Sequence, residues 1–158
     1  MNVPLIQTKN LKKYFKTPKG NLHAVDNVNL EIQKGQTLGV VGESGCGKST
    51  LGRTILRLLE ATEGEVLYEG ENILDYNFKQ MQDMRKKMQI IFQDPYSSLN
   101  PRMTVSEIIS EPIKVCKTVR DRIEIDNKVF DLMETVGLAE RLVNTYPHEL
   151  DGGRRQRV

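Results

Sequence analysis

The sequence predicts an α/β domain, and three observations support this prediction. Up to about residue 95, short runs of apolar and β-branched residues alternate with one strongly helical segment. A glycine-rich loop, Gly42–Ser49, joins one of these runs to that helical segment. Beyond residue 95 the spacing of apolar residues is mostly that of helices. We therefore expect a mixed α/β part followed by a helical part.

The β-strands of the first part are predicted from alternation and from apolar runs. Val28, Leu30 and Ile32 alternate with polar neighbours, as in a strand with one buried face. Thr37–Val41 is a nearly continuous apolar run, which is typical of a strand buried on both faces of a sheet. The expected strands cover residues 5–8, 25–32, 37–41, 65–69 and 88–92.

Helical spacing and capping residues predict the helices. The helix after the glycine-rich loop carries one apolar face, and a short helix is expected over residues 78–87. Thr104 and Glu107 match a capping box, which opens a helix that Pro112 is expected to interrupt. A longer helix follows, and Gly137 is placed to end it. The apolar residues of these helices are Leu51, Ile55, Leu58 and Leu59 in the first, and Ile125, Val129, Leu132, Met133 and Val136 in the last.

Composition excludes several classes of protein. The chain has 158 residues, 38% of them hydrophobic and 28% charged, with a net charge of +2, which is typical of a globular domain and gives no reason to expect a nucleic-acid partner. No apolar run approaches the roughly 20 residues that cross a bilayer, and the start of the chain lacks a secretory signal. Cys46 and Cys116 form no CxxC or Cys/His cluster, which argues against a disulfide framework or a structural zinc.

The glycine-rich loop satisfies the pattern G-x-x-x-x-G-K-[ST] between a predicted strand and a predicted helix. Glycines allow successive backbone N–H groups to point at phosphate oxygens, and the helix adds its positive N-terminal end. Lys48 is expected near the β- and γ-phosphates, Ser49 on Mg²⁺ and Thr50 near the α-phosphate. The predicted nucleotide-binding residues are Gly42, Glu43, Ser44, Gly45, Cys46, Gly47, Lys48, Ser49 and Thr50.

Two alternatives remain open at this loop. A glycine-rich turn between a strand and a helix can also bind nothing, although the flanking elements make that less expected. Cys46 could act as a redox switch, because a helix N-terminus lowers a thiol pKa, but a small residue tolerated at a variable position is the expected interpretation.

Two further motifs resemble those of one family. Residues 90–101, IIFQDPYSSLNP, resemble the Q-loop of ABC-transporter ATPases, and QDPYSSLNPRMTV is similar to the branch that powers oligopeptide and dipeptide importers. The loop ESGCGKSTLGR resembles the F-type member of that branch's ATPase pair. Residues 146–157 lie where such proteins carry their signature motif. The resemblance runs through essentially the whole chain.

The resemblance implies a P-loop NTPase (RecA-like) core with an antiparallel β subdomain and an α-helical subdomain. Residues 1–96 would hold the first part of the core and residues 97–158 the helical subdomain. The last predicted helix has only begun at the final residue, so we expect the domain to be truncated at its C-terminus. By the same resemblance, Gln93 would join the shell of Mg²⁺ or of the lytic water and relay the nucleotide state. Alternatively, Gln93 is simply an exposed residue of a surface loop that connects a strand to a helix.

The resemblance also implies roles at both ends of the chain. Phe15 falls where the family carries its adenine-stacking aromatic residue, with Tyr14 as the fallback; either ring could instead pack under the β layer. Asp151, Gly152 and Gly153 would cap the γ-phosphate bound to a second domain. Asp151 stands where the family has serine, and Arg154 where it has glutamine. A carboxylate would repel that phosphate, and the nearby arginines would offset the repulsion.

By resemblance, the function is that of the ATP-binding motor subunit of an importer, which couples ATP binding and hydrolysis to uptake of oligopeptides or dipeptides. Its cofactors would be ATP and Mg²⁺. Its partners would be transmembrane permease subunits, a second ATPase subunit and, indirectly, an extracytoplasmic solute-binding protein, with the subunit peripheral on the cytoplasmic face of the membrane. The family places its catalytic acids beyond the signature motif, so this chain alone is expected to be inactive in hydrolysis. The alternatives are a small P-loop nucleotide kinase and a non-hydrolysing nucleotide-binding fragment.

Overall fold

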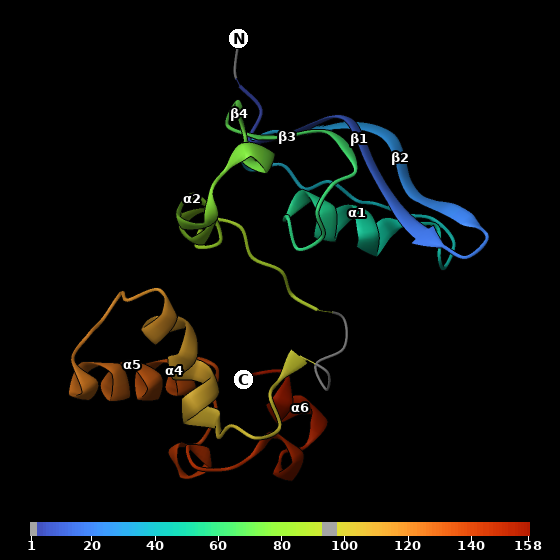
Figure 1. The fold of residues 1–158 in the computed structure, drawn as a ribbon. Helices are drawn as coiled ribbons and strands as arrows, with labels where there is room; N and C mark the ends of the chain where they lie inside the picture. Colours follow the sequence, from blue (N-terminus) through green and yellow to red (C-terminus); the bar gives the residue numbers. More distant parts are fainter. Residues whose placement is uncertain (1–2, 93–97) are drawn as a thin grey trace. The chain divides into compact units, whose positions relative to one another are not determined.

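The computed structural model describes residues 3–92 and 98–158. The chain divides into two compact units, Met1–Gln89 and Ile90–Val158, and each has its own hydrophobic core. In Figure 1 the first unit runs from blue to green and the second from yellow to red. Within the described ranges, no helix is long and apolar enough to cross a bilayer.

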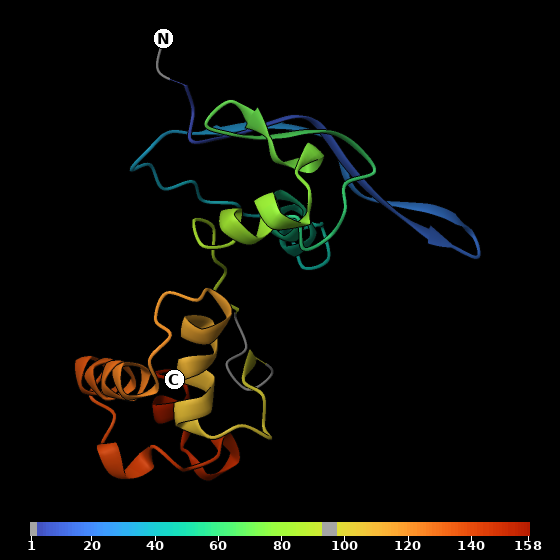
Figure 2. The same cartoon turned by 60° about the vertical axis from the view of Figure 1, so that its left-hand side comes forward.

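The first unit is an antiparallel sheet with two helices on one face. The strands pair in the order β2-β1-β3-β4, and each neighbouring pair is antiparallel. Helices α1 and α2 lie against the same face of this sheet in both views (Figures 1 and 2). The elements are β1 (Ile6–Thr17), β2 (Gly20–Ile32), α1 (Lys48–Ile55), β3 (Glu63–Tyr68), β4 (Glu71–Asn72), the 3₁₀ turn η1 (Ile73–Asp75) and α2 (Phe78–Met84).

The core of this unit fills the space between sheet and helices. Leu11 of β1, Val25 of β2 and Val66 of β3 are almost fully buried, and they point to the face that α1 and α2 cover. Burial of large apolar side chains contributes about 1.5–3 kcal/mol each, so this face holds the helices in place. The remaining buried members are Ile73, Met81 and Met84, with Leu51 and Ile55 of α1 packed against them.

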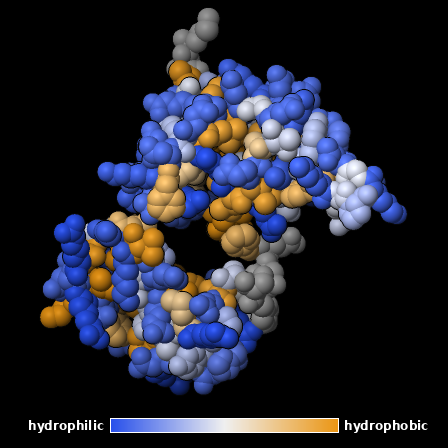
Figure 3. Space-filling model, in the orientation of Figure 1, coloured by the Kyte–Doolittle hydropathy of each residue, from blue (hydrophilic) through white to orange (hydrophobic). Residues whose placement is uncertain are grey.

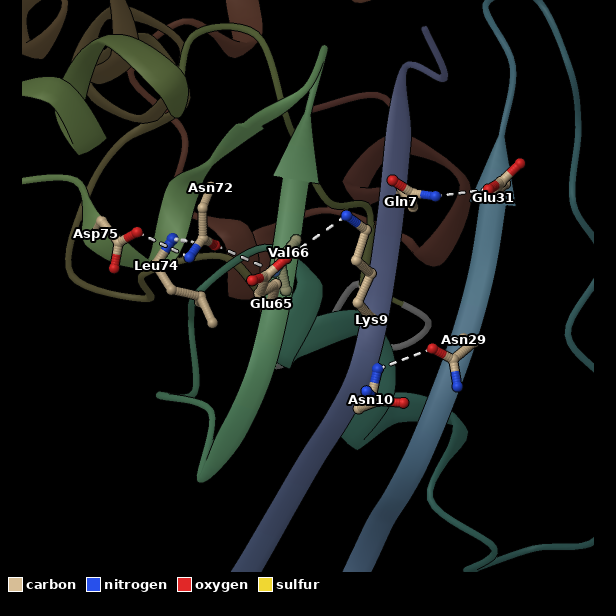
Figure 4. A network of polar contacts seen from close by, with 10 residues as sticks. All are labelled: Gln7, Lys9, Asn10, Asn29, Glu31, Glu65, Val66, Asn72, Leu74 and Asp75. Atoms are coloured by element: carbon tan, nitrogen blue, oxygen red, sulfur yellow. Dashed lines mark hydrogen bonds and ion pairs between the residues drawn. The ribbon is translucent and has the colours of Figure 1, made fainter.

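Polar side chains connect the strands where the sheet is exposed (Figure 4). The Gln7 amide of β1 donates to the Glu31 carboxylate of β2 over 2.6 Å, and the Lys9 ammonium lies 3.8 Å from the Glu65 carboxylate of β3. Exposed pairs of this kind contribute little to stability, roughly 0–1 kcal/mol each. Because each pair joins residues on neighbouring strands, they favour the observed register over a slipped one.

Three of the predicted strands are confirmed, and two are not. Residues 5–8, 25–32 and 65–69 fall almost entirely within β1, β2 and β3. Residues 37–41 and 88–92 are not strands: Val41 and Ile91 are 93% and 98% exposed instead of buried. An apolar run becomes a strand only when a neighbouring strand accepts and donates its backbone hydrogen bonds. Within residues 3–92 and 98–158 neither run pairs with another strand.

The second unit is helical, as expected. Helices α4 and α5 pack against each other, and short turns follow them. Its buried core is Val105, Ile113, Val119, Ile125, Val129, Met133, Leu138 and Leu150. The elements are α4 (Val105–Val115), α5 (Arg122–Thr135), the 3₁₀ turns η2 (Glu140–Leu142) and η3 (Pro147–Glu149), and α6 (Gly152–Arg155). Figure 3 shows orange apolar side chains among blue polar ones on the surface of both units.

The capping box of α4 is confirmed, but the predicted interruption is wrong. The Thr104 N–H donates to the Glu107 carboxylate over 2.8 Å, and the Glu107 N–H donates to the Thr104 hydroxyl over 3.4 Å. Helix α4 continues through Pro112 to Val115. Proline removes one helical hydrogen bond, but Ile113 and Ser110 are buried on either side of it, and this packing holds the last turn in place.

The predicted end of α5 at Gly137 is confirmed. Gly137 has a φ of +68°, and its N–H donates to the Glu134 carbonyl over 3.0 Å. The Leu138 N–H donates to the Met133 carbonyl over 2.8 Å, and both of these side chains are buried, as in a Schellman cap. The predicted apolar face of α5 is correct at Ile125, Val129 and Met133, whereas Leu132 and Val136 are 42% and 41% exposed at its margin.

Replacing Gly137 with alanine is expected to destabilise the second unit by about 1 kcal/mol, because a Cβ is strained at positive φ. Gly52 lies inside α1 with ordinary φ, and nothing lies within 4 Å of a Cβ built there. Gly52→Ala is therefore expected to stabilise the protein by about 0.5–1 kcal/mol. Urea unfolding measures the change in the free energy of unfolding, which should be negative for Gly137→Ala and positive for Gly52→Ala. A more stable Gly137→Ala variant would contradict the assignment of the cap.

The capping box of α4 is expected to stabilise the protein less in acid, because it contains the Glu107 carboxylate. Its hydrogen bonds from the Thr104 backbone and hydroxyl lower the pKa of the Glu107 carboxyl below its usual value. A lowered pKa stabilises the folded state above the carboxyl's ordinary pKa, and the contribution disappears as pH falls through the folded value. The free energies of unfolding of the wild type and of Glu107→Gln should therefore differ at pH 7, and the difference should be smaller at pH 3. An equal difference at both pH values would show that the charge has no role in the cap.

Candidate functional site

The N-terminus of α1 leaves backbone donors without a cap. Gly47 is the N-cap residue, its backbone is left-handed with a φ of 97°, and it makes no side-chain hydrogen bond to the first turn. No acidic residue lies in that turn. The first N–H groups of a helix have no partner inside the helix, and its dipole favours negative charge there. The start of α1 is therefore suited to an anion such as phosphate.

Lys48 adds a full positive charge at the same place. Its ammonium donates to the Gly42 carbonyl over 2.8 Å and to the Glu43 carbonyl over 2.5 Å, so the side chain folds back over the loop. It also lies 3.5 Å from the Cys46 sulfur, which is exposed. The loop thus gathers a cation and uncapped N–H groups within a few residues. Both interpretations of Cys46 stay open.

The glycine-rich loop contacts the sheet closely at Gly47, the residue before α1. A Cβ on Gly47 would fall on the carbonyl oxygen of Ala24 in β2, so only glycine fits there. Ala24 escaped the sequence analysis, because a contact made by a backbone carbonyl leaves no signal in the identity of the side chain. The loop is therefore docked on the sheet at its final residue.

The first turn of α1 holds the candidate metal ligand. Ser49 is exposed there, and Thr50 is anchored through its carbonyl, which accepts the hydroxyl of the buried Thr54 over 2.7 Å. In residues 3–92 and 98–158, no three His, Cys, Asp or Glu side chains gather as a metal site. Gln93, the other predicted metal ligand and catalytic residue, lies outside the described residues.

Tyr14 is engaged with neighbours on the sheet. Its ring stacks on His23 with centroids 3.8 Å apart, and its hydroxyl donates to the Asp26 carboxylate over 2.6 Å. This hydrogen bond raises the pKa of the Tyr14 phenol and lowers the pKa of the Asp26 carboxyl. The fallback aromatic residue for adenine is therefore already committed to contacts within the protein.

Phe15 lies on the other face of β1. Side chains alternate along a strand, so Phe15 shares a face with Lys13 and Leu11. Leu11 is fully buried in the core beside α1, and the Lys13 ammonium lies 5.0 Å above the Phe15 ring. Phe15 therefore stands on the face of the sheet that carries α1, while Tyr14 stands on the opposite face.

The predicted signature segment lies in the second unit, and the phosphate loop lies in the first. Asp151 is the N-cap of α6: its carboxylate accepts the Arg154 N–H over 2.8 Å. The same carboxylate lies 3.4 Å from the Arg154 side-chain nitrogen Nε. Gly152 and Gly153 form the first turn. The negative charge of Asp151 is thus paired within its own segment, at the two positions that depart from the family's pattern.

The chain matches the sequence model of a known family. The sequence model described as ABC transporter matches residues 25–158. This range includes the glycine-rich loop, α1, and helices α4, α5 and α6 of the second unit.

The similar curated proteins are transport ATPases by name. The oligopeptide transport ATP-binding protein OppF of Bacillus subtilis is 52% identical over 159 residues, which cover 100% of this chain and 52% of the relative. OppF of Escherichia coli is 46% identical over 152 residues, covering 96% and 46%. The dipeptide transport ATP-binding protein DppF of Haemophilus influenzae is 44% identical over 163 residues, covering 99% and 50%. The chain spans about half the length of these relatives.

Solved structures share the fold. The ATP-binding cassette MJ0796, a dimer in a post-hydrolysis state bound to ADP and Pi, matches with a TM-score of 0.80 and 30% identity, over 96% of this chain and 66% of its own. The structure of cbiO1 from Clostridium perfringens, part of the transporter complex cbiONQ, matches with a TM-score of 0.72 and 26% identity, over 98% and 58%. The predicted P-loop NTPase fold class is therefore confirmed.

Gly47→Ala is expected to destabilise the first unit by about 3 kcal/mol, because the added methyl group meets backbone that cannot move aside. Gly45 also has positive φ, at 84°, but nothing lies within 4 Å of a Cβ built there. Gly45→Ala is expected to cost only the backbone strain, about 1 kcal/mol. The difference in thermal stability between the two variants measures the contribution of the contact with Ala24. An equal loss of stability in both variants would contradict that contact.

Proposed function

The chain belongs to the ABC transporter family, and we propose that it is the ATP-binding part of a motor subunit that drives import of oligopeptides or dipeptides. The names of the relatives support this cargo, since OppF and DppF proteins match 96–100% of the chain at 44–52% identity. The chain covers only about half of each relative. Hydrolysis, cargo and partners therefore belong to the proposal for the whole protein.

One observation supports nucleotide binding above the others: the uncapped start of α1 lies beside the Lys48 ammonium. We assign the phosphates of ATP to residues 42–50, with Lys48 moving from the loop carbonyls to the β- and γ-phosphates. Mg²⁺ would neutralise phosphate charge, with Ser49 and Gln93 among its ligands. Phe15 is assigned to adenine, because it stands on the face of the sheet that carries α1.

The partners follow from the same proposal. A second ATPase subunit would receive the segment Asp151–Gly153 at its own γ-phosphate, with the charge of Asp151 offset by Arg154. Transmembrane permease subunits would hold the motor at the cytoplasmic face of the membrane, and an extracytoplasmic solute-binding protein would act indirectly. ATP binding would close the two motor domains and hydrolysis would reopen them. The alternative of a small nucleotide kinase is not favoured, because the matched family and relatives are transport ATPases.

Lys48→Ala is expected to weaken MgATP binding at least tenfold, because it removes the cation that faces the β- and γ-phosphates. Lys79 of α2 is exposed and lies outside the loop, so Lys79→Ala is the matched control and should leave the affinity unchanged. Titration with a fluorescent ATP analogue measures both. Equal affinity of wild type and Lys48→Ala would overturn the proposed function.

A further inference from the structure

Strand β2 has a bulge at the position that faces the phosphate loop. Lys13 and Tyr14 are consecutive in β1, but their partners in β2 are Val25 and His23. Ala24 is therefore an extra residue without a partner in the register. A β-bulge of this kind bends its strand and redirects the neighbouring backbone and side chains.

This bulge is the part of the sheet that Gly47 contacts. The Ala24 carbonyl oxygen lies where a Cβ of Gly47 would be, so the N-cap of α1 rests directly on the bulged backbone. A small displacement of Ala24 would therefore displace Gly47. The N–H groups of the first turn of α1 would move with it, because they follow Gly47 in a rigid helix.

Tyr14 holds the bulge from the opposite face of the sheet. Its ring stacks on His23, before the bulge, at 3.8 Å and an interplanar angle of 14°. Its hydroxyl donates to Asp26, after the bulge, over 2.6 Å, and the His23 ring nitrogen Nδ1 lies 3.5 Å from the same carboxylate. The extra residue puts His23 and Asp26 on one face, while Val25 points into the core.

Tyr14 is itself fixed from the other edge of β1. Its N–H donates to the Thr62 hydroxyl over 2.9 Å, and the Thr62 N–H donates to the Lys12 carbonyl over 2.8 Å. The Lys12 ammonium pairs with Glu63 at 2.7 Å. The backbone of Tyr14 is thus tied to the start of β3, and its side chain spans the bulge in β2.

We propose that Tyr14 is a positioning residue for the nucleotide site, acting through the Ala24 bulge on Gly47. Its side chain lies on the face of the sheet away from α1, so it does not touch the nucleotide. It sets the position of the phosphate-binding N–H groups by holding the backbone against which they are docked. This role rests on the proposed function, because it refers to the same site.

The test removes the hydroxyl and keeps the ring. Tyr14→Phe loses the bond to Asp26 and retains the stack on His23. Tyr76→Phe is the matched control, because the exposed Tyr76 hydroxyl donates to the Glu71 carboxylate in the same unit, away from the bulge. We expect both variants to lose similar thermal stability. Only Tyr14→Phe should weaken MgATP binding, by about fivefold, as for the loss of one hydrogen bond.

A second measurement does not depend on nucleotide. Amide hydrogen exchange without ATP should be faster over residues 42–50 in Tyr14→Phe and unchanged there in Tyr76→Phe. Exchange in the loop that is unchanged, or raised equally in both variants, would overturn the proposal. So would unchanged MgATP affinity in Tyr14→Phe. A wild type that binds no ATP would overturn the proposed function, and the exchange measurement would still decide whether Tyr14 controls the loop.

Discussion

The contact between Gly47 and the Ala24 carbonyl is the constraint on which the candidate site depends. A helix N-terminus attracts phosphate only if its N–H groups are uncapped and held in position. Gly47 supplies no side chain that could cap them, and β2 supplies a fixed surface behind them. The same missing Cβ thus leaves the donors free and allows the close approach that places them.

The two units differ in where the hydrogen-bond partners of their backbones lie along the chain. In the second unit, hydrogen bonds within each helix satisfy the backbone, and short-range signals at Thr104 and Gly137 set the helix ends. In the first unit, strands depend on partners distant in the chain. The apolar runs 37–41 and 88–92 have strand-like composition, but they have no strand partner among the described residues, and most of their large side chains are exposed. Composition therefore predicted that these residues favour strands, but it could not predict whether they would pair with another strand.

Asp151 and Arg154, the two residues that depart from the family's signature motif, contact each other in the structure. In sequence they are two separate substitutions, each unfavourable or neutral when considered alone. The N-cap geometry brings the carboxylate to the Arg154 N–H and to its guanidinium, so one residue offsets the charge of the other. Any interaction of this segment with a phosphate would therefore depend on Asp151 and Arg154 together.

The sequence by itself determined the fold class, the glycine-rich loop before α1, the N-cap of α4, the C-cap of α5 and the family, because these depend on residue types at short, fixed spacings. Only the tertiary structure decided the remaining features. Alternation along β1 already puts Phe15 and Tyr14 on opposite faces, but only the structure showed that the face with Phe15 is the one that carries α1. It also revealed Ala24, whose role belongs to a carbonyl group that every residue has. Such contacts arise when distant segments pack together, and no local pattern of side chains encodes them.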